Sequence, residues 1–308
     1  ISNNLQFVEH NVQEEVKDDT INIIFNIFEG EKKLIERINI KGNTVTNEDV
    51  IRGELISDEG DPFILVGLEK SISKLKSRNI FKDVKYEIID GSDSNLKIVD
   101  ILVEERPTGE ISAGAGVGTS GGALSFGVKE NNWLGTGKAV EFKMDLDEES
   151  LSGILSFSDP NYNYLGNSIN YFLKSESNDK PDQGYENTVV SAGVGTSFEQ
   201  YKDLRVSLGT SFSYDDLRTL SSATDALKKN SGEFTELSVN YGLSHDKRDR
   251  AFMPTSGGVT SFSQTIPVFA DKSFISNTFA HSSYKSLTEN IVGAGKFYVS
   301  SINGLGSD

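Results

Sequence analysis

A glycine-rich stretch, GEISAGAGVGTSGG at residues 109–122, contains the residue type that a phosphate-binding loop needs. Such a loop closes with Gly-Lys-Ser or Gly-Lys-Thr between a strand and a helix. This stretch has no lysine, and the later pair Gly137-Lys138 is followed by Ala139 and by no helical pattern. The sequence therefore does not predict nucleotide binding, and the glycines need another explanation.

Other residues that could carry chemistry are also poorly placed for it. The histidines, His10, His245 and His281, lie far apart and in no metal-ligand spacing. The absence of cysteine excludes disulfides and thiolate chemistry. The acidic run DLDEES at residues 145–150 lacks the glycine and distal glutamate of a calcium loop, and no Gly-x-Ser-x-Gly motif occurs. We expect no enzyme, no metal and no cofactor.

Composition limits the remaining classes. The chain has 308 residues and a net charge of -16 at pH 7, which argues against a nucleic-acid partner because phosphate binding needs clustered Lys and Arg. The chain has no run of 18 apolar residues, so the sequence does not predict a transmembrane helix. The chain begins at Ile1 without Met, so we expect a piece of a longer protein.

The first third of the chain alternates between helical and strand patterns. A strand is predicted at residues 34–43, a helix from 46 with Thr46 or Asn47 as its N-cap, a second helix at 65–81, and two strands at 83–90 and 96–106. The order is β-α-α-β-β. Two strand patterns before it, at residues 7–16 and 21–31, resemble the end of a similar unit, which suggests a tandem array.

After residue 109 strict alternation predicts about eleven strands of roughly ten residues, the length that spans a bilayer when tilted. In residues 139–147, Val140, Phe142 and Met144 face one way and charged residues the other. A soluble β-sandwich with one wet face also alternates. Full charges in mid-strand favour a membrane barrel with a polar lumen.

The connections between these strands also alternate in character. Every second connection belongs to one set of five, and four of these carry aromatic residues, as expected of a girdle at the periplasmic membrane interface. The other connections, at residues 145–150, 175–187 and 217–233, are mostly longer and polar, and we assign them to the cell exterior; the last has room for a helical turn. The residues expected to form the periplasmic girdle and its turns are Trp133, Gly135, Gly137, Tyr162, Tyr164, Tyr201, Arg250, Phe252 and Pro254.

Two turn motifs carry a resemblance to a known family. NNWLGTG at residues 131–137 and DRAFMPTSGG at 249–258 are similar to motifs of the BamA family of outer-membrane protein assembly factors. Residues 34–106 resemble the last polypeptide-transport-associated (POTRA) domain of that family. The resemblance implies an α+β fold of POTRA domains (β-α-α-β-β) followed by an antiparallel transmembrane β-barrel. The family barrel has about sixteen strands, so we expect this chain to be truncated at both ends.

The implied organisation has three parts: the last strands of a truncated POTRA domain at residues 1–31, the last POTRA domain at 32–106, and the N-terminal part of the barrel at 107–308. The implied location is the bacterial outer membrane, with the POTRA domains in the periplasm. The implied function is insertion of client barrel proteins by strand augmentation and lateral gating without ATP. The implied partners are unfolded outer-membrane protein clients, accessory lipoproteins and outer-membrane lipid. Alternatives are a translocase of the same superfamily, a passive porin-like channel and a soluble β-rich adhesin.

The resemblance gives the opening glycines a role. The first barrel strand would close the barrel against the last, and glycines weaken a strand, so a poorly held seam would open sideways. The same glycines also fit a simpler role, in which they let the barrel bend or a plug approach. The expected gate and client-pairing residues are Ile111, Ala113, Gly114, Ala115, Gly116, Val117 and Gly118.

Two POTRA features complete the expected sites. The strand segment Val84, Lys85, Tyr86, Glu87, Ile88 and Ile89 is expected to be an exposed edge that pairs with clients, or else an ordinary solvated edge protected by its charges. Glu54 lies where the family's last POTRA domain faces an accessory partner. A surface helix charge is the simpler interpretation of Glu54.

Overall fold

The structure is a computed structural model that describes residues 8–17, 20–29, 32–118, 121–250, 253–288 and 291–305. The chain divides into two compact units, residues 1–108 with 134–136, and residues 109–133 with 137–308. Among the described residues, no helix has the length and apolarity needed to span a membrane. The two units are built on different principles, and each is described in turn.

The first unit contains the predicted β-α-α-β-β arrangement. Strand β3 (Leu34–Lys41) is followed by helices α1 (Glu48–Arg52) and α2 (Leu65–Ser77) and by strands β4 (Phe81–Asp90) and β5 (Leu96–Glu105). The sheet order is β3-β5-β4, with β3 parallel and β4 antiparallel to β5. The fold class predicted for this part of the chain is confirmed.

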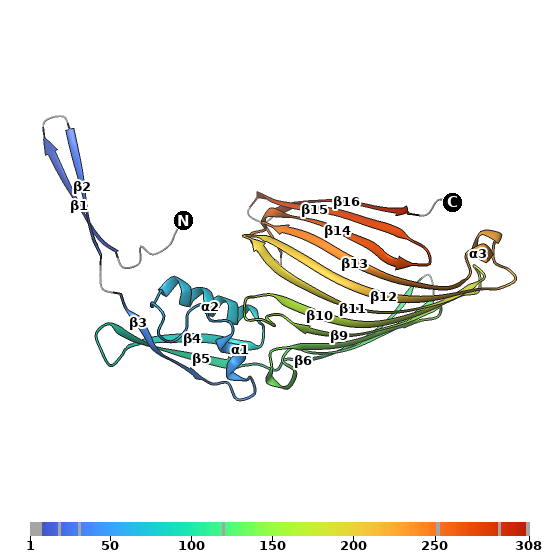
Figure 1. The fold of residues 1–308 in the computed structure, drawn as a ribbon, viewed down its shortest axis with the longest axis horizontal. Coiled ribbons are helices and arrows are strands. Elements are labelled where there is room, and N and C mark those ends of the chain that lie inside the picture. The colour runs from blue at the N-terminus through green and yellow to red at the C-terminus, as the bar shows by residue number, and fades with distance from the viewer. Residues whose placement is uncertain are drawn as a thin grey trace. The chain divides into compact units, whose positions relative to one another are not determined.

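A compact hydrophobic core joins the helices to this sheet. Ile51 of α1 and Leu75 of α2 are fully buried against Val99 and Ile101 of β5 and Val84 of β4. The stripe predicted on α2 is present, since Ile72 and Leu75 are both buried. Figure 1 shows α2 lying over one face of the sheet. The other face carries polar residues such as Asn39, whose amide donates to Asp100 Oδ1 at 2.7 Å.

Two further strands precede the β-α-α-β-β element. Strands β1 (Val8–Lys17) and β2 (Thr20–Glu29) form a separate two-stranded antiparallel sheet. The strand pair that the sequence predicted at this end of the chain is therefore present.

The second unit is one antiparallel sheet of eleven strands in chain order, from β6 to β16 (Figure 1). The predicted number of strands is confirmed. The helical turn predicted between β12 and β13 is α3 (Asp225–Lys229), with Thr224 as its N-cap. The strands are β6 (Gly109–Gly118), β7 (Gly121–Glu130), β8 (Ala139–Asp147), β9 (Ser150–Asp159), β10 (Ser168–Lys180), β11 (Tyr185–Tyr201), β12 (Leu204–Thr219), β13 (Gly232–Asp246), β14 (Ser256–Ala270), β15 (Phe274–Thr288) and β16 (Ile291–Gly304).

Strand register sorts the side chains of this sheet onto two faces. Phe142 of β8 pairs with Val128 and Leu155, whereas the neighbouring Lys143 pairs with Gly127 and Ile154. Continued across the sheet, the register gives one mainly apolar face and one face rich in Ser, Gly and charged residues. An apolar outer face and a polar inner face are the pattern of a membrane barrel wall.

Strands β10 to β16 are longer than the sequence predicted. They have 13 to 17 residues, and the connection expected at residues 175–187 shrinks to a turn, because β10 continues to Lys180 and β11 begins at Tyr185. The expectation of a long loop there was wrong. The alternation of apolar residues stops before the strands end, and backbone pairing continues beyond it through polar residues such as Asn178 and Asn187.

Candidate functional site

The first candidate site is the edge strand β6. Within the described residues β6 pairs only with β7, and at the opposite edge β16 pairs only with β15. On the apolar face of β6, Ile111 is 79% exposed and Val117 is 94% exposed. Among the described residues, β6 therefore makes one ladder of backbone hydrogen bonds, to β7.

The glycines of β6 lie on its other face, opposite small residues. Gly114 pairs with Ser125, Gly116 with Ala123 and Gly118 with Gly121. The missing side chains leave a shallow hollow of about 270 Å³ that extends to Asp145 and Asp147. A Cβ added at Gly116 meets no atom within 4 Å, so packing does not require glycine at this position.

The second candidate site is the POTRA edge strand β4. The sheet has two edges, and the outer edge of β3 is already covered: the N–H of Ile35 donates to Asp61 O at 2.9 Å, and the N–H of Gly60 donates to Ile35 O at 2.7 Å. Glu59 Oε1 also accepts the N–H of Ile38 at 3.0 Å. The register shows no comparable cover on β4 among the described residues.

Strand β4 combines a buried anchor with an exposed end. Val84 is in the core and Tyr86 packs against it, whereas Lys85, Glu87, Ile88 and Ile89 are exposed. Lys85 and Glu87 place charges along this edge, a feature that discourages indiscriminate strand pairing in other proteins. The sequence analysis did not predict that residues 59–63 cover β3, because the glycine and acidic residues of this segment are typical of an ordinary loop.

Glu54 is not the exposed helix charge that the simpler interpretation expected. It is 7% exposed, and its Oε1 lies 3.0 Å from Arg78 Nη1, at the end of α2. The pair ties the segment after α1 to the end of α2. A partner that contacts the Glu54 carboxylate must compete with Arg78, because the two groups are already hydrogen bonded.

The most strongly hydrogen-bonded carboxylate described in the POTRA unit is that of Glu105, a residue that the sequence analysis did not identify. Its carboxylate accepts hydrogen bonds from the backbone N–H groups of Thr44, Val45 and Thr46, at 2.6 Å for Thr46. Burial alone raises the pKa of Glu105, but hydrogen bonds from Thr46, Thr44 and Val45 outweigh it and bring the pKa to about 2. The charge fixes the loop between β3 and α1.

The expected girdle turns all lie at one end of the large sheet. The strands are antiparallel and follow one another in chain order, so every second connection falls at the same end. Trp133, Tyr162, Tyr164 and Tyr201 are exposed there. The turns after β7 and β9 each contain the same kind of internal hydrogen bond. Asn132 Oδ1 accepts the N–H of Gly137, and Asn161 Oδ1 accepts the N–H of Gly166, both at 2.7 Å. The repeated spacing of Asn and Gly, five residues apart, was a usable signal in the sequence.

Glycine is required in these turns by backbone conformation. Gly135 and Gly137 have φ of 73° and 67°, a left-handed region that residues with a Cβ rarely adopt. Lys138 Nζ also lies 3.3 Å from Asp159 Oδ2, so adjacent turns are linked. The first motif is therefore a rigid turn.

The second motif is organised by Asp249. Its Oδ1 accepts the N–H of Thr255 at 2.9 Å, and its Oδ2 accepts the hydroxyl of Thr255 at 2.6 Å. The hydrogen bond from the Thr255 hydroxyl, followed by one from the N–H of Ser256, lowers the pKa of Asp249 to about 2. Arg250 Nε lies 3.7 Å from Asp249 Oδ2 and Pro254 is half-buried, whereas Phe252 falls outside the described residues.

No group of three or more His, Asp or Glu side chains in the described ranges is arranged to hold a metal ion.

Comparison with known proteins identifies the family. Residues 132–308, more than half of the chain, match the Omp85 superfamily domain. The chain belongs to the Omp85 superfamily. Residues 34–106 of this Omp85 chain match the POTRA family, described as a surface antigen variable number repeat.

Similar proteins of the superfamily include assembly factors. The chain is 26% identical over 272 residues to the outer membrane protein assembly factor BamA of Neisseria meningitidis, covering 82% of this chain and 34% of the relative. It thus spans about a third of that relative's length. The predicted resemblance to the BamA family is confirmed. BamA proteins are outer-membrane proteins with periplasmic POTRA domains, which confirms the predicted location.

Two solved structures share the fold. BamA from Haemophilus ducreyi lacking POTRA domains 1–3 has a TM-score of 0.72 at 20% identity, covering 97% of this chain and 61% of that one. CdiB from Escherichia coli has a TM-score of 0.59 at 15% identity, covering 97% and 59%. At these identities the likeness concerns the fold alone.

Proposed function

We propose that the intact protein is an outer-membrane protein assembly factor that inserts client β-barrel proteins by strand augmentation and lateral opening at β6, without ATP. The observation that carries the proposal is the bareness of β6, whose alternate residues Gly114, Gly116 and Gly118 offer no side chain to a neighbouring strand. The assembly-factor relatives support it. We further propose that residues 1–31 end a preceding POTRA domain, 32–106 form the last one and 107–308 begin the barrel.

The energetics favour opening at this strand. Glycine in a strand costs about 0.5–1 kcal/mol relative to alanine. Cross-strand side-chain pairs contribute roughly 0.2–1 kcal/mol each in a sheet, and the glycines of β6 can supply none to a strand on either side. An unzipped β6 edge presents free N–H and C=O groups, to which a client strand adds largely regardless of its sequence.

The POTRA unit has a matching role in this proposal. With β3 covered by residues 59–63, β4 is the edge that accepts an unfolded client strand in the periplasm. Ile88 and Ile89 supply exposed apolar contacts for alternate client side chains. Accessory lipoproteins dock on the same unit, with Glu54 as a contact if Arg78 releases it, and outer-membrane lipid contacts the exposed aromatic residues of the turns.

The proposal is tested by substituting glycine with valine at two matched positions of the intact protein. A Cβ at either Gly116 or Gly153 meets no atom within 4 Å, but Gly116 lies in edge strand β6 and Gly153 in internal strand β9. Each variant is reconstituted in liposomes without nucleotide, and the rate of client barrel insertion is measured. Gly116→Val should slow insertion about fivefold to tenfold by strengthening the seam, and Gly153→Val should leave it unchanged.

Equal insertion rates for the two variants and the unmodified protein would contradict a gate at β6. The translocase and channel alternatives are separated by depleting the intact protein in its host. An assembly factor lowers the outer-membrane levels of many unrelated barrel proteins, whereas a translocase affects the export of one partner and a channel affects neither.

A further inference from the structure

The outward face of the sheet changes character abruptly on three neighbouring strands. On β10, β11 and β12 the register places mainly apolar residues side by side, up to the row formed by Ser175, Val190 and Tyr214. The next row on the same face is Ser177, Thr188 and Asp216, and the last is Asp179, Glu186 and Arg218. The apolar rows face lipid, so the polar rows above them stand at the level of lipid headgroups.

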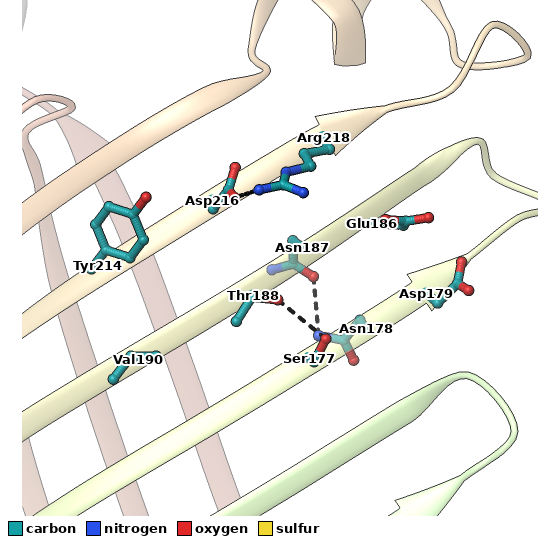
Figure 2. Close-up of a pocket in the computed structure, with 10 residues that line it drawn as sticks. All are labelled: Ser177, Asn178, Asp179, Glu186, Asn187, Thr188, Val190, Tyr214, Asp216 and Arg218. Carbon is teal, nitrogen blue, oxygen red and sulfur yellow. Dashed lines mark hydrogen bonds and ion pairs between the residues drawn. The ribbon is translucent and has the colours of Figure 1, made fainter.

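These polar rows line a hollow of about 500 Å³, called here the outward shelf. Figure 2 shows Arg218 beside Asp216, with Glu186 and Asp179 nearer the strand ends. Arg218 Nη2 lies 2.7 Å from Asp216 Oδ2, and its side chain remains 74% exposed. The volume is in the range of small-ligand sites, and the residues come from rigid strands rather than from a loop.

The chemistry of the outward shelf favours hydroxyl groups over phosphates. It contains three carboxylates and one guanidinium, a net charge of -2, which repels an anionic headgroup. Carboxylates accept several hydrogen bonds from hydroxyls, and Ser177 and Thr188, whose hydroxyls lie 3.2 Å apart, both donate and accept them. Tyr214 adds an aromatic ring at the border between the apolar and polar rows, as amphipathic residues do at membrane interfaces.

We propose that the outward shelf binds the saccharide headgroup of a glycolipid in the outer leaflet. The acyl chains of that lipid lie along the apolar rows of β10 to β12, and the sugar hydroxyls are hydrogen bonded by Asp216, Thr188 and Glu186. The apolar rows directly below the shelf fix the occupant as a lipid-linked sugar rather than a free one. This site is separate from the seam at β6 and does not depend on insertase activity.

The test uses the intact protein in bilayers of phosphatidylethanolamine with either digalactosyldiacylglycerol or phosphatidylglycerol of the same acyl chains. Native mass spectrometry counts the lipids retained after detergent extraction. The glycolipid should be retained about tenfold over phosphatidylglycerol. Free digalactose, added at the concentration at which the glycolipid saturates the protein, should not displace it. Equal retention of the two lipids, or displacement by the free sugar, would overturn the proposal.

Two variants locate the binding. Asp216→Ala should lower glycolipid retention about tenfold. Asp215→Ala, one residue earlier and on the opposite face, should leave it unchanged. Exposed Asp179 and Glu186 also permit a double reversal to Lys, which changes the charge of the shelf from -2 to +2 and should invert the preference toward phosphatidylglycerol. Equal losses for Asp215→Ala and Asp216→Ala, or an unchanged preference after reversal, would contradict the assignment.

Discussion

The POTRA unit and the eleven-stranded sheet use apolar side chains in opposite ways. In the POTRA unit they form a closed core, in which Ile51, Leu75 and Ile101 have no exposed surface. In the described part of the sheet the largest apolar side chains point outward instead, and Ala223 in the loop before α3 is its one buried hydrophobic residue. The same residue types therefore stabilise the first unit by excluding water, whereas in the second they form an exposed apolar face of the kind that meets lipid in a membrane barrel.

This difference determines how each unit responds to change. A packed core has neighbours on all sides, so a lost methyl group leaves a cavity. A lipid-facing side chain has mobile neighbours that fill the space, and the strand is held mainly by its backbone ladder. Under the proposed function we therefore expect β6, whose alternate residues are glycines, to exchange partners more readily than the internal strands, without loss of a core.

The largest expected effect comes from replacing a leucine with alanine in each of the two regions. Leu75→Ala should destabilise the POTRA unit by about 3–5 kcal/mol, because Leu75 is fully buried. Leu208→Ala, on the apolar face of β12, should cost less than about 1 kcal/mol in a bilayer. Hydrogen exchange of POTRA and sheet peptides in the intact protein measures both. Similar local destabilisation would mean that the regions do not differ as described.

The next effect tests the ion pair that joins the segment after α1 to α2. Arg78→Ala leaves the Glu54 carboxylate buried without its cation and should destabilise the POTRA unit by about 2–4 kcal/mol. The double variant Arg78→Ala with Glu54→Gln should recover part of that loss, as followed by hydrogen exchange of α2. A double variant no more stable than Arg78→Ala would show that the loss does not come from an unpaired Glu54.

A pH-dependent effect is expected in the POTRA unit from Glu105. Because the pKa of Glu105 falls from 4.5 to about 2 on folding, its contribution is present above pH 4.5 and is lost as pH falls toward 2. Glu105→Gln should remove about 1–3 kcal/mol at neutral pH. Unfolding followed between pH 6 and pH 3 should then show a smaller pH dependence in the variant. Parallel curves for the two proteins would contradict the role of this carboxylate.

The smallest effect is expected in the two matched turns of the sheet. Asn161→Ala removes the acceptor of the Gly166 N–H and should cost about 0.5–1.5 kcal/mol locally. Asn132→Ala should cost more, because Asn132 is buried. Exchange rates of the Gly137 and Gly166 amides measure the two losses. A larger effect at Asn161 than at Asn132 would overturn this ranking.

The sequence predicted what depends on periodicity. Alternation located β6 to β16, and the stripe of Ile72 and Leu75 located α2, because burial or lipid contact imposes a period on the side chains. Turn glycines such as Gly137 were found because a positive φ restricts the residue type.

Contacts between distant segments were not predictable in this way. The cover over β3 uses backbone groups of Gly60 and Asp61, which leave no mark in residue type. The burial of Glu54 depends on Arg78, 24 residues away. The outward shelf was read as part of a loop, because polar residues extend β10 and β11 beyond the apolar pattern.

The central claim, that client strands add to β6, is tested most directly by photo-crosslinking. A photoreactive amino acid is placed at Ile111 in β6 or at Leu155 in β9, both exposed on the apolar face, and adducts are collected during client insertion by the intact protein. The account predicts client adducts about tenfold more abundant at Ile111 than at Leu155, because β6 would exchange its partner at the seam for a client strand, whereas β9 is paired with β8 and β10. Equal yields at the two positions, or adducts at Leu155 alone, would contradict it.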